Sequence, residues 1–92
     1  MTLEQKAEIA FREAEKMFPA DGLIGVKHIG KLGDEDFFDA EINFELIADF
    51  EAISISGDGK LRFIAMFDFW EVERKSGFMK REQVFRFPLE AR

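Results

Sequence analysis

The sequence predicts an α+β fold, in which an N-terminal amphipathic helix packs on a four- to five-stranded antiparallel β-sheet arranged as a meander. Apolar residues recur at helical spacing over the first eighteen positions, and the period changes to two from residue 23 onward. Glycine-containing turn sequences then separate the apolar segments. A helix followed by a run of strands is typical of α+β folds, and 92 residues have room for one domain, residues 1–92.

The helix is predicted over residues 3–18. Thr2 and Gln5 have the spacing of a capping box, in which each side chain bonds to the backbone N–H of the other residue. Pro19 ends the helix because proline disfavours helical geometry in the residue before it. The apolar stripe consists of Leu3, Ala7, Ala10, Phe11, Ala14 and Phe18.

Two strands are predicted next, at 23–32 and 37–46, and both alternate with a period of two. In the first strand Ile24, Val26, His28 and Leu32 share one side, with Lys27 and Lys31 on the other. In the second, the core side carries Phe38, Ala40, Ile42, Phe44 and Leu46, and the solvent side carries Asp39, Glu41, Asn43 and Glu45.

Three further strands are predicted at 51–56, 61–74 and 78–87. Ser56–Gly59 and Ser76–Gly77 contain the glycines that tight hairpin turns need. Residues 46–53 suit a short helix as well as a strand; a turn near Ala48 and Asp49 followed by a strand is preferred. Cystatin-like, hot-dog-like and unclassified helix-on-sheet architectures are all compatible with this order of elements.

The composition indicates a cytoplasmic protein. The chain has no cysteine, so it has no disulfide, no thiolate metal site and no thiol nucleophile, as is typical of a reducing compartment. Glu4, Glu8 and Glu13 are unlike a signal peptide, and no apolar run approaches the roughly 18 residues of a membrane span. No membrane association is expected.

No cofactor or metal is predicted. Gly25–Lys31 spells most of a phosphate-binding loop, but Leu32 stands where Ser or Thr would bind magnesium, and the segment continues a strand alternation. Four nearby acids lack the spacing and the central glycine of a calcium loop, so they are expected to be solvated turn residues. These acids are Asp34, Glu35, Asp36 and Asp39.

His28 and Asp68 are the only candidates for catalysis. His28 is the single histidine, and Asp68 lies between two phenylalanines, an apolar setting that raises the pKa of a carboxylate. The alternative is that His28 is a half-buried strand residue and that Asp68 points outward or pairs with Arg or Lys. With no Ser or Cys partner indicated, the protein is expected not to be an enzyme.

The charge distribution gives a stronger indication of function. Residues 32–59 contain nine acids and no base, whereas 60–92 contain five acids and eight bases. A dense acidic block attracts basic partners and repels nucleic acid. Carboxylates on alternate positions of a strand are spaced comparably to successive phosphates along a nucleic-acid strand, so a row of them imitates that backbone. The predicted partner-binding residues are Asp34, Glu35, Asp36, Asp39, Glu41, Glu45, Asp49 and Glu51. The alternative is solvation, or pairing with Lys80, Arg81 and Arg86 of the last strand, within the same sheet or in a second copy.

The segment 61–74 is apolar on both faces if it is a strand. One face would carry Phe63, Ala65, Phe67 and Phe69, and the other Ile64, Met66, Trp70 and Val72. One helix does not cover both faces of a sheet, so the second set predicts a self-association or partner interface, with a homodimer as the simplest form. A curled or bulged sheet with a single core is the alternative.

These observations together predict a small, non-catalytic protein-binding module. We expect an inhibitor or adaptor that occupies a basic surface of a larger protein, such as a nucleic-acid-binding surface, similar in type to toxin-immunity proteins and phage anti-defence inhibitors. One alternative is a hot-dog-like or cystatin-like domain that binds a small apolar ligand or has a modest active site. A second alternative is a structural homo-oligomer subunit.

Overall fold

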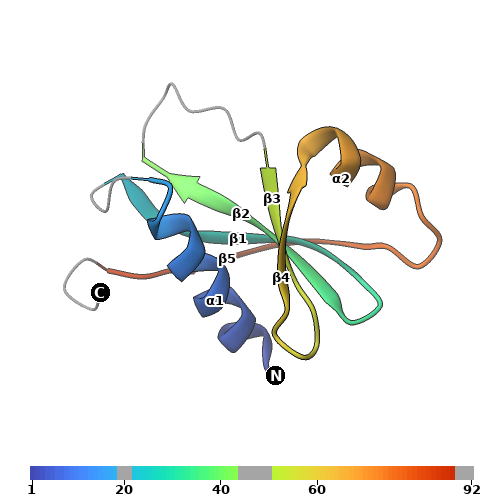
Figure 1. Cartoon of the computed structure of the whole chain (residues 1–92), viewed down its shortest axis with the longest axis horizontal. Coiled ribbons are helices and arrows are strands. Elements are labelled where there is room, and N and C mark those ends of the chain that lie inside the picture. Colours follow the sequence, from blue (N-terminus) through green and yellow to red (C-terminus); the bar gives the residue numbers. More distant parts are fainter. Residues whose placement is uncertain (19–21, 44–50, 89–92) are drawn as a thin grey trace.

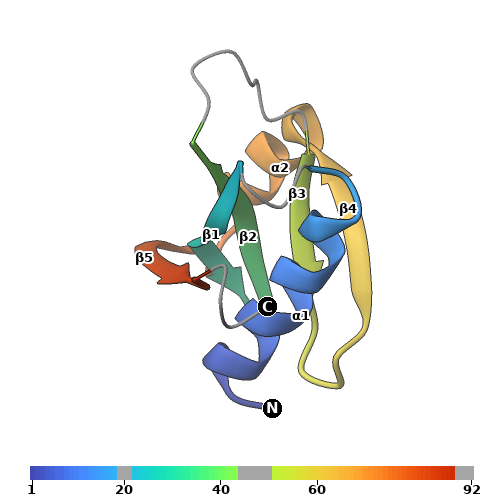
Figure 2. The same cartoon turned by 90° about the vertical axis from the view of Figure 1, so that its left-hand side faces the viewer.

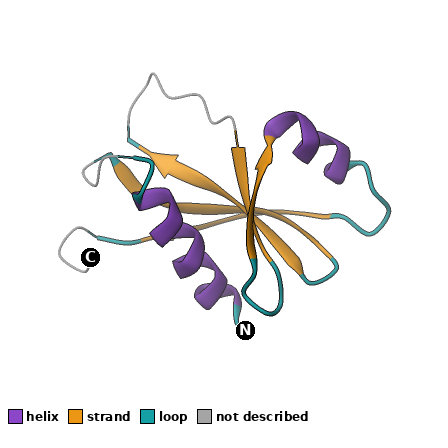
Figure 3. Ribbon diagram, in the orientation of Figure 1, coloured by secondary structure: helices purple, strands orange, loops and turns teal. Residues whose placement is uncertain are grey.

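The structure is a computed structural model that describes residues 1–18, 22–43 and 51–88. The elements follow the order α1 (Leu3–Glu15), β1 (Leu23–Leu32), β2 (Glu35–Ile42), β3 (Glu51–Ile55), β4 (Leu61–Ala65), α2 (Met66–Glu73) and β5 (Met79–Arg86). The five strands form one antiparallel sheet in the order β4-β3-β2-β1-β5 (Figures 1 and 3). The predicted α+β class is therefore confirmed, and β5 returns to pair with β1 at the edge opposite β4.

The predicted capping box begins α1. The Gln5 N–H donates to Thr2 Oγ1 at 3.2 Å, and the Thr2 N–H donates to Gln5 Oε1 at 2.7 Å. The helix ends at Glu15 rather than at residue 18, because the Met17 N–H bonds to the Ala14 carbonyl at 3.0 Å and tightens the last turn. Phe18 still packs against the core from outside the helix.

The first core lies between α1 and one face of the sheet. The apolar stripe of α1 meets strand residues that alternate in the sequence, with Phe38 fully buried and Ala40 and Ile42 packed beside it. This confirms one face of the alternation predicted for 37–46; residues 44–46 of that segment lie outside the described residues. The buried members of this core are Ala7, Ala10, Phe11, Ala14, Leu23, Val26, Phe38, Ile53 and Ile55.

The prediction of one strand over 61–74 is wrong. The chain is a strand only to Ala65, and the next eight residues form α2. Phe69 and Val72 are three residues apart and are buried on the inner side of this helix. In so short a segment, apolar residues on one helical face also occupy both faces of a hypothetical strand.

Helix α2 covers a second core on the other face of the sheet (Figures 1 and 2). Neighbouring residues Phe37 and Phe38 are both fully buried but belong to different cores, because successive strand side chains point to opposite faces. The face of β2 that was expected to be exposed to solvent is therefore partly buried. The buried members of the second core are Phe37, Ala52, Ile64, Phe69 and Val72.

A register shift in β1 changes which residues share a face. Between His28 and Gly30 the pairing with both β2 and β5 slips. As a result Leu32 packs in the second core, not on the side of Val26 and His28 as expected. Gly30 lies under the Phe78 ring, where a Cβ atom would come within 2.1 Å of Cζ. The segment Gly25–Lys31 is a strand throughout, which agrees with the strand alternation on which the rejection of a phosphate-binding loop was based.

The turn between β3 and β4 is closed by Asp58. The Ser56 hydroxyl donates to Asp58 Oδ1, and the Lys60 N–H donates to the same oxygen at 3.2 Å. These hydrogen bonds, with that from Ser56 the largest cause, hold the pKa of the Asp58 carboxyl below its ordinary value of 3.8. The ionised carboxylate therefore stabilises the folded turn, a contribution present above pH 3.8 and lost as the pH falls through the lower, folded pKa.

We expect Ser56→Ala to move the pKa of Asp58 back toward its ordinary value. An NMR titration of the Asp58 side-chain carbon in both forms measures this shift directly. Ser76→Ala is the matched control, since Ser76 is an exposed serine of another turn. Equal Asp58 pKa values in the native protein and in Ser56→Ala would contradict the assignment.

Candidate functional site

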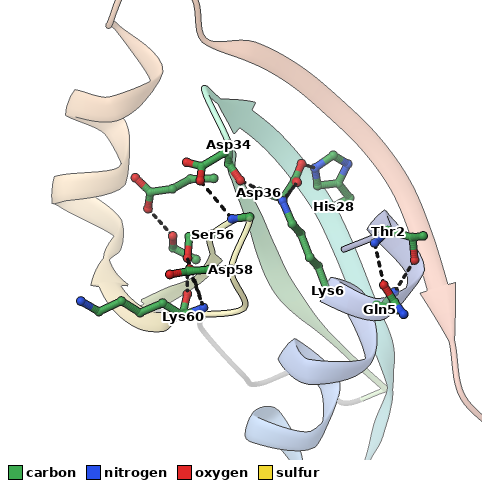
Figure 4. A network of polar contacts seen from close by, with 12 residues as sticks. Thr2, Gln5, Lys6, His28, Asp34, Asp36, Ser56, Asp58 and Lys60 are labelled. Atoms are coloured by element: carbon green, nitrogen blue, oxygen red, sulfur yellow. Dashed lines mark hydrogen bonds and ion pairs between the residues drawn. The ribbon is translucent and has the colours of Figure 1, made fainter.

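The single histidine lies in a buried polar network between α1 and the sheet (Figure 4). Asp36 joins the other two members: its Oδ1 is 2.7 Å from His28 Nε2, and its Oδ2 is 2.7 Å from Lys6 Nζ. Lys6 Nζ also donates to the Asp34 carbonyl at 2.8 Å. Because a carboxylate only accepts, His28 Nε2 carries the proton in this contact. All three side chains are at least nine-tenths buried.

The network bears on three residues named from the sequence. His28 pairs with Asp36, whereas Asp68 is exposed on α2, on the other side of the sheet, so the two candidates for catalysis are not brought together and Asp68 points outward, as in the alternative. Asp36 was also predicted to bind a partner, but its carboxylate is buried and shared by two internal donors. The buried ion pair therefore affects the stability of the fold, because burying either charge without the other would be costly.

Several other predicted partner-binding acids are engaged within the chain. Arg62 donates to the Glu35 carboxylate from Nε and Nη2, at 2.9 to 3.1 Å, and the Ser54 hydroxyl donates to the same carboxylate. Asp34 accepts from the Gly57 N–H at 3.2 Å. Glu51 is exposed at the start of β3. Glu45 and Asp49 lie outside the described residues.

Basic residues of β1 and β5 lie beside the expected row of carboxylates on β2. Arg86 of β5 reaches Glu41 of β2 with Nη2 2.8 Å from Oε1, and both residues pair with Gly25 of the intervening strand. Lys27 stands opposite Asp39 in the register of β1 and β2. For Glu41 the internal-pairing alternative is therefore the one observed, with Arg86 as the partner.

The predicted apolar interface divides into buried and exposed parts. Ile64 and Val72 belong to the second core, and Met66 is half-buried beside it. Trp70 is 49% exposed on the outer side of α2, where it meets Phe67 edge to face with ring centroids 5.2 Å apart. Phe67 is 77% exposed, more than any other large apolar side chain in the described residues. The exposed aromatic pair Phe67–Trp70 is our candidate contact site.

A cleft of about 260 Å³ lies beside this pair, between α2 and the open part of the sheet. Helix α2 contributes Met66, Phe69, Trp70 and Glu73, which follow the i, i+3, i+4, i+7 spacing of one helical face. Strands β1, β2 and β5 contribute Lys27, Ile29, Asp39, Lys80, Arg81 and Glu82. The cleft therefore combines an apolar wall with charges of both signs.

Comparison with known proteins finds no match. No protein-family model, curated protein or solved structure matches the chain. Within the described residues no group of three or more His, Asp or Glu side chains is placed to hold a metal ion. Neither described helix has the length and apolar character needed to cross a membrane.

Two residues of importance were missed from the sequence. The predicted strand puts Phe67 on the same face as Phe69. The positions of Met66, Phe69 and Val72 at intervals of three, however, put Phe67 on the opposite side of a helix. Lys6 was not singled out, although it lies four residues before Ala10 on the buried stripe of α1. Helical periodicity was the available signal in both cases.

Proposed function

We propose that the protein is a non-catalytic, cytoplasmic binding module, an inhibitor or adaptor, that docks on a basic surface of a larger protein through the outer face of α2. The exposure of the Phe67–Trp70 pair carries the proposal. Large aromatic side chains dominate binding energies when a partner buries them, and exposed apolar groups rimmed by polar residues are typical of interaction sites. In this protein the pair occupies a helix already fixed from beneath by Phe69 and Val72.

The charge around the aromatic pair favours a basic partner. The exposed residues of α2 include Asp68, Glu71 and Glu73, and the helix has no basic residue in its last turn. The formal net charge of the chain is −6. Acidic side chains at the rim of an interface increase the rate of association with a positive surface and weaken binding to acidic ones.

The proposal is tested by capture on the immobilised protein from a lysate of its native host, followed by mass spectrometry. We expect a basic protein to be retained at low salt, released at high salt, and reduced at least tenfold by Phe67→Ala/Trp70→Ala. Phe63→Ala is the matched control, because Phe63 is also an exposed phenylalanine, 42% accessible, but lies on β4. Salt sensitivity follows from screening of charges at the rim.

Two outcomes would contradict the proposal. Retention of the same proteins by the double variant would show that the aromatic pair does not make the contact. Sedimentation of the native protein as a dimer, with Phe67→Ala/Trp70→Ala sedimenting as a monomer, would show that the pair contacts a second copy. Circular dichroism of the variants establishes that each remains folded.

A further inference from the structure

The cleft beside α2 has an uneven distribution of charge. Its helical wall carries the Glu73 carboxylate and the aromatic ring of Trp70, two groups that attract a cation. The sheet contributes three bases and two acids. The helical side of the cleft therefore favours a cation, and the lysines on the sheet side are partners for an anion.

Four of these charges have no ion-pair partner among the residues that the structure describes. Within the described ranges, none of the following side chains makes an ion pair shorter than 4.0 Å: Lys27, Glu73, Lys80 and Glu82. Arg81 is turned toward its own strand, where Nη1 donates to the Lys80 carbonyl at 3.0 Å. The two lysines of adjacent strands β1 and β5 are thus the cations available to a ligand.

The size of the cleft limits what can occupy it. Pockets for complete small molecules are commonly about 300–1,000 Å³, and this cleft is about 260 Å³. It therefore suits a single amino-acid residue. The apolar wall of Ile29, Met66 and Phe69 matches the methylene groups of a long basic side chain, which pack on apolar surface while their charged end stays polar.

We propose that this cleft binds a C-terminal arginine or lysine, with the side-chain cation between Trp70 and Glu73 and the α-carboxylate on Lys27 and Lys80. A polypeptide end and a free basic amino acid share this chemistry. The choice of a polypeptide end rests on the proposed function, because α2 would then present the aromatic pair and the cleft to the same partner. The charge arrangement itself applies to either source.

The test uses Trp70, the single tryptophan of the chain, as a fluorescent reporter inside the site. The probes are acetyl-Gly-Gly-Arg with a free carboxylate, the same peptide as an amide, acetyl-Gly-Gly-norleucine with a free carboxylate, and free arginine. We expect saturable binding of the first peptide with a Kd of about 1 mM. The amide and the norleucine peptide should each bind about fivefold more weakly, the effect of losing one solvent-exposed ion pair.

Matched variants separate the two ends of the ligand. Lys80→Gln should weaken the free-acid arginine peptide about fivefold and leave the amide unaffected, whereas Glu73→Gln should weaken both arginine peptides but not the norleucine peptide. Lys75→Gln and Glu4→Gln are the charge-matched controls outside the cleft. Chemical-shift changes of the Trp70 indole N–H and of residues 27 and 80 provide a second readout that does not depend on fluorescence.

The outcomes are distinct from those of the capture experiment. Equal affinity for the acid and the amide, or no shift of the cleft resonances by any peptide, would overturn the cleft assignment even if the Phe67–Trp70 pair proves to bind a basic protein. Binding of the peptides without capture of such a protein would leave the cleft assignment standing and remove the proposed function. Free arginine binding as tightly as the peptide would identify the amino acid as the source.

Discussion

Replacing Asp36 with Asn is expected to lower the free energy of unfolding by about 3–5 kcal/mol, the usual cost of leaving one member of a buried ion pair without its partner. The substitution preserves the shape of the side chain, and the amide oxygen still accepts from His28 Nε2. It places an NH₂ group against the Lys6 ammonium, which is 2.7 Å from Asp36 Oδ2 and almost fully buried. The loss is a large fraction of the 5–15 kcal/mol that typically stabilises a domain.

Urea unfolding followed by circular dichroism measures this loss. Glu51→Gln is the matched control, since Glu51 is exposed on a strand, and its effect should stay within about 0.5 kcal/mol. A double variant, Asp36→Asn/Lys6→Met, removes the buried charge and should recover much of the lost stability. A loss no larger than that of Glu51→Gln would show that the pair is not buried in solution.

The importance of Asp36 was not accessible from the sequence, although its carboxylate was noted. The sequence places it among three consecutive acids in an apparent turn, Asp34 to Asp36, where solvation is the ordinary expectation. Its burial depends on two partners at positions 6 and 28, which come together only when α1 packs on β1 and β2. Local composition predicts the charge of a segment, but tertiary pairing decides which charges remain free.

The elements that could be predicted have a single strong periodicity. The capping box and apolar stripe of α1, the whole of β1 and the alternation of β2 are examples. The prediction failed at 66–73, because eight residues with several aromatics satisfy a period of two and a period of 3.6 about equally well. The candidate site followed this error: Trp70 was identified, but Phe67 was placed on the wrong side.

The edge position of β5 was also outside the reach of the sequence. The last strand was expected to pair with the strand before it, as in a meander, but it pairs with β1 at the edge of the sheet opposite β4. This return brings Arg86 within 2.8 Å of Glu41, and it places Lys80 in the cleft opposite α2. The basic C-terminal third and the acidic middle of the chain are therefore neighbours, which partly neutralises the acidic block.

Phe37→Ala is expected to cost about 3–5 kcal/mol of stability, as is usual for a phenylalanine removed from a core. Phe37 is fully buried, and its ring centroid lies 5.4 Å from that of Phe69 on α2 and 6.3 Å from that of Phe78. It is therefore the main aromatic contact between the sheet and α2. Its loss should release the helix from the sheet as well as destabilise the domain.

Urea unfolding gives the change in stability, and Trp70 emission in native buffer reports the position of α2. Phe63→Ala removes the same side chain from a half-exposed site on the same sheet, so it should cost no more than about 1 kcal/mol and leave the emission unchanged. Phe38→Ala removes the same side chain from the first core, which is covered by α1 instead of α2. If Phe37→Ala and Phe38→Ala alter Trp70 emission equally, α2 is held by the stability of the whole domain; a change confined to Phe37→Ala shows that the second core by itself positions the aromatic pair.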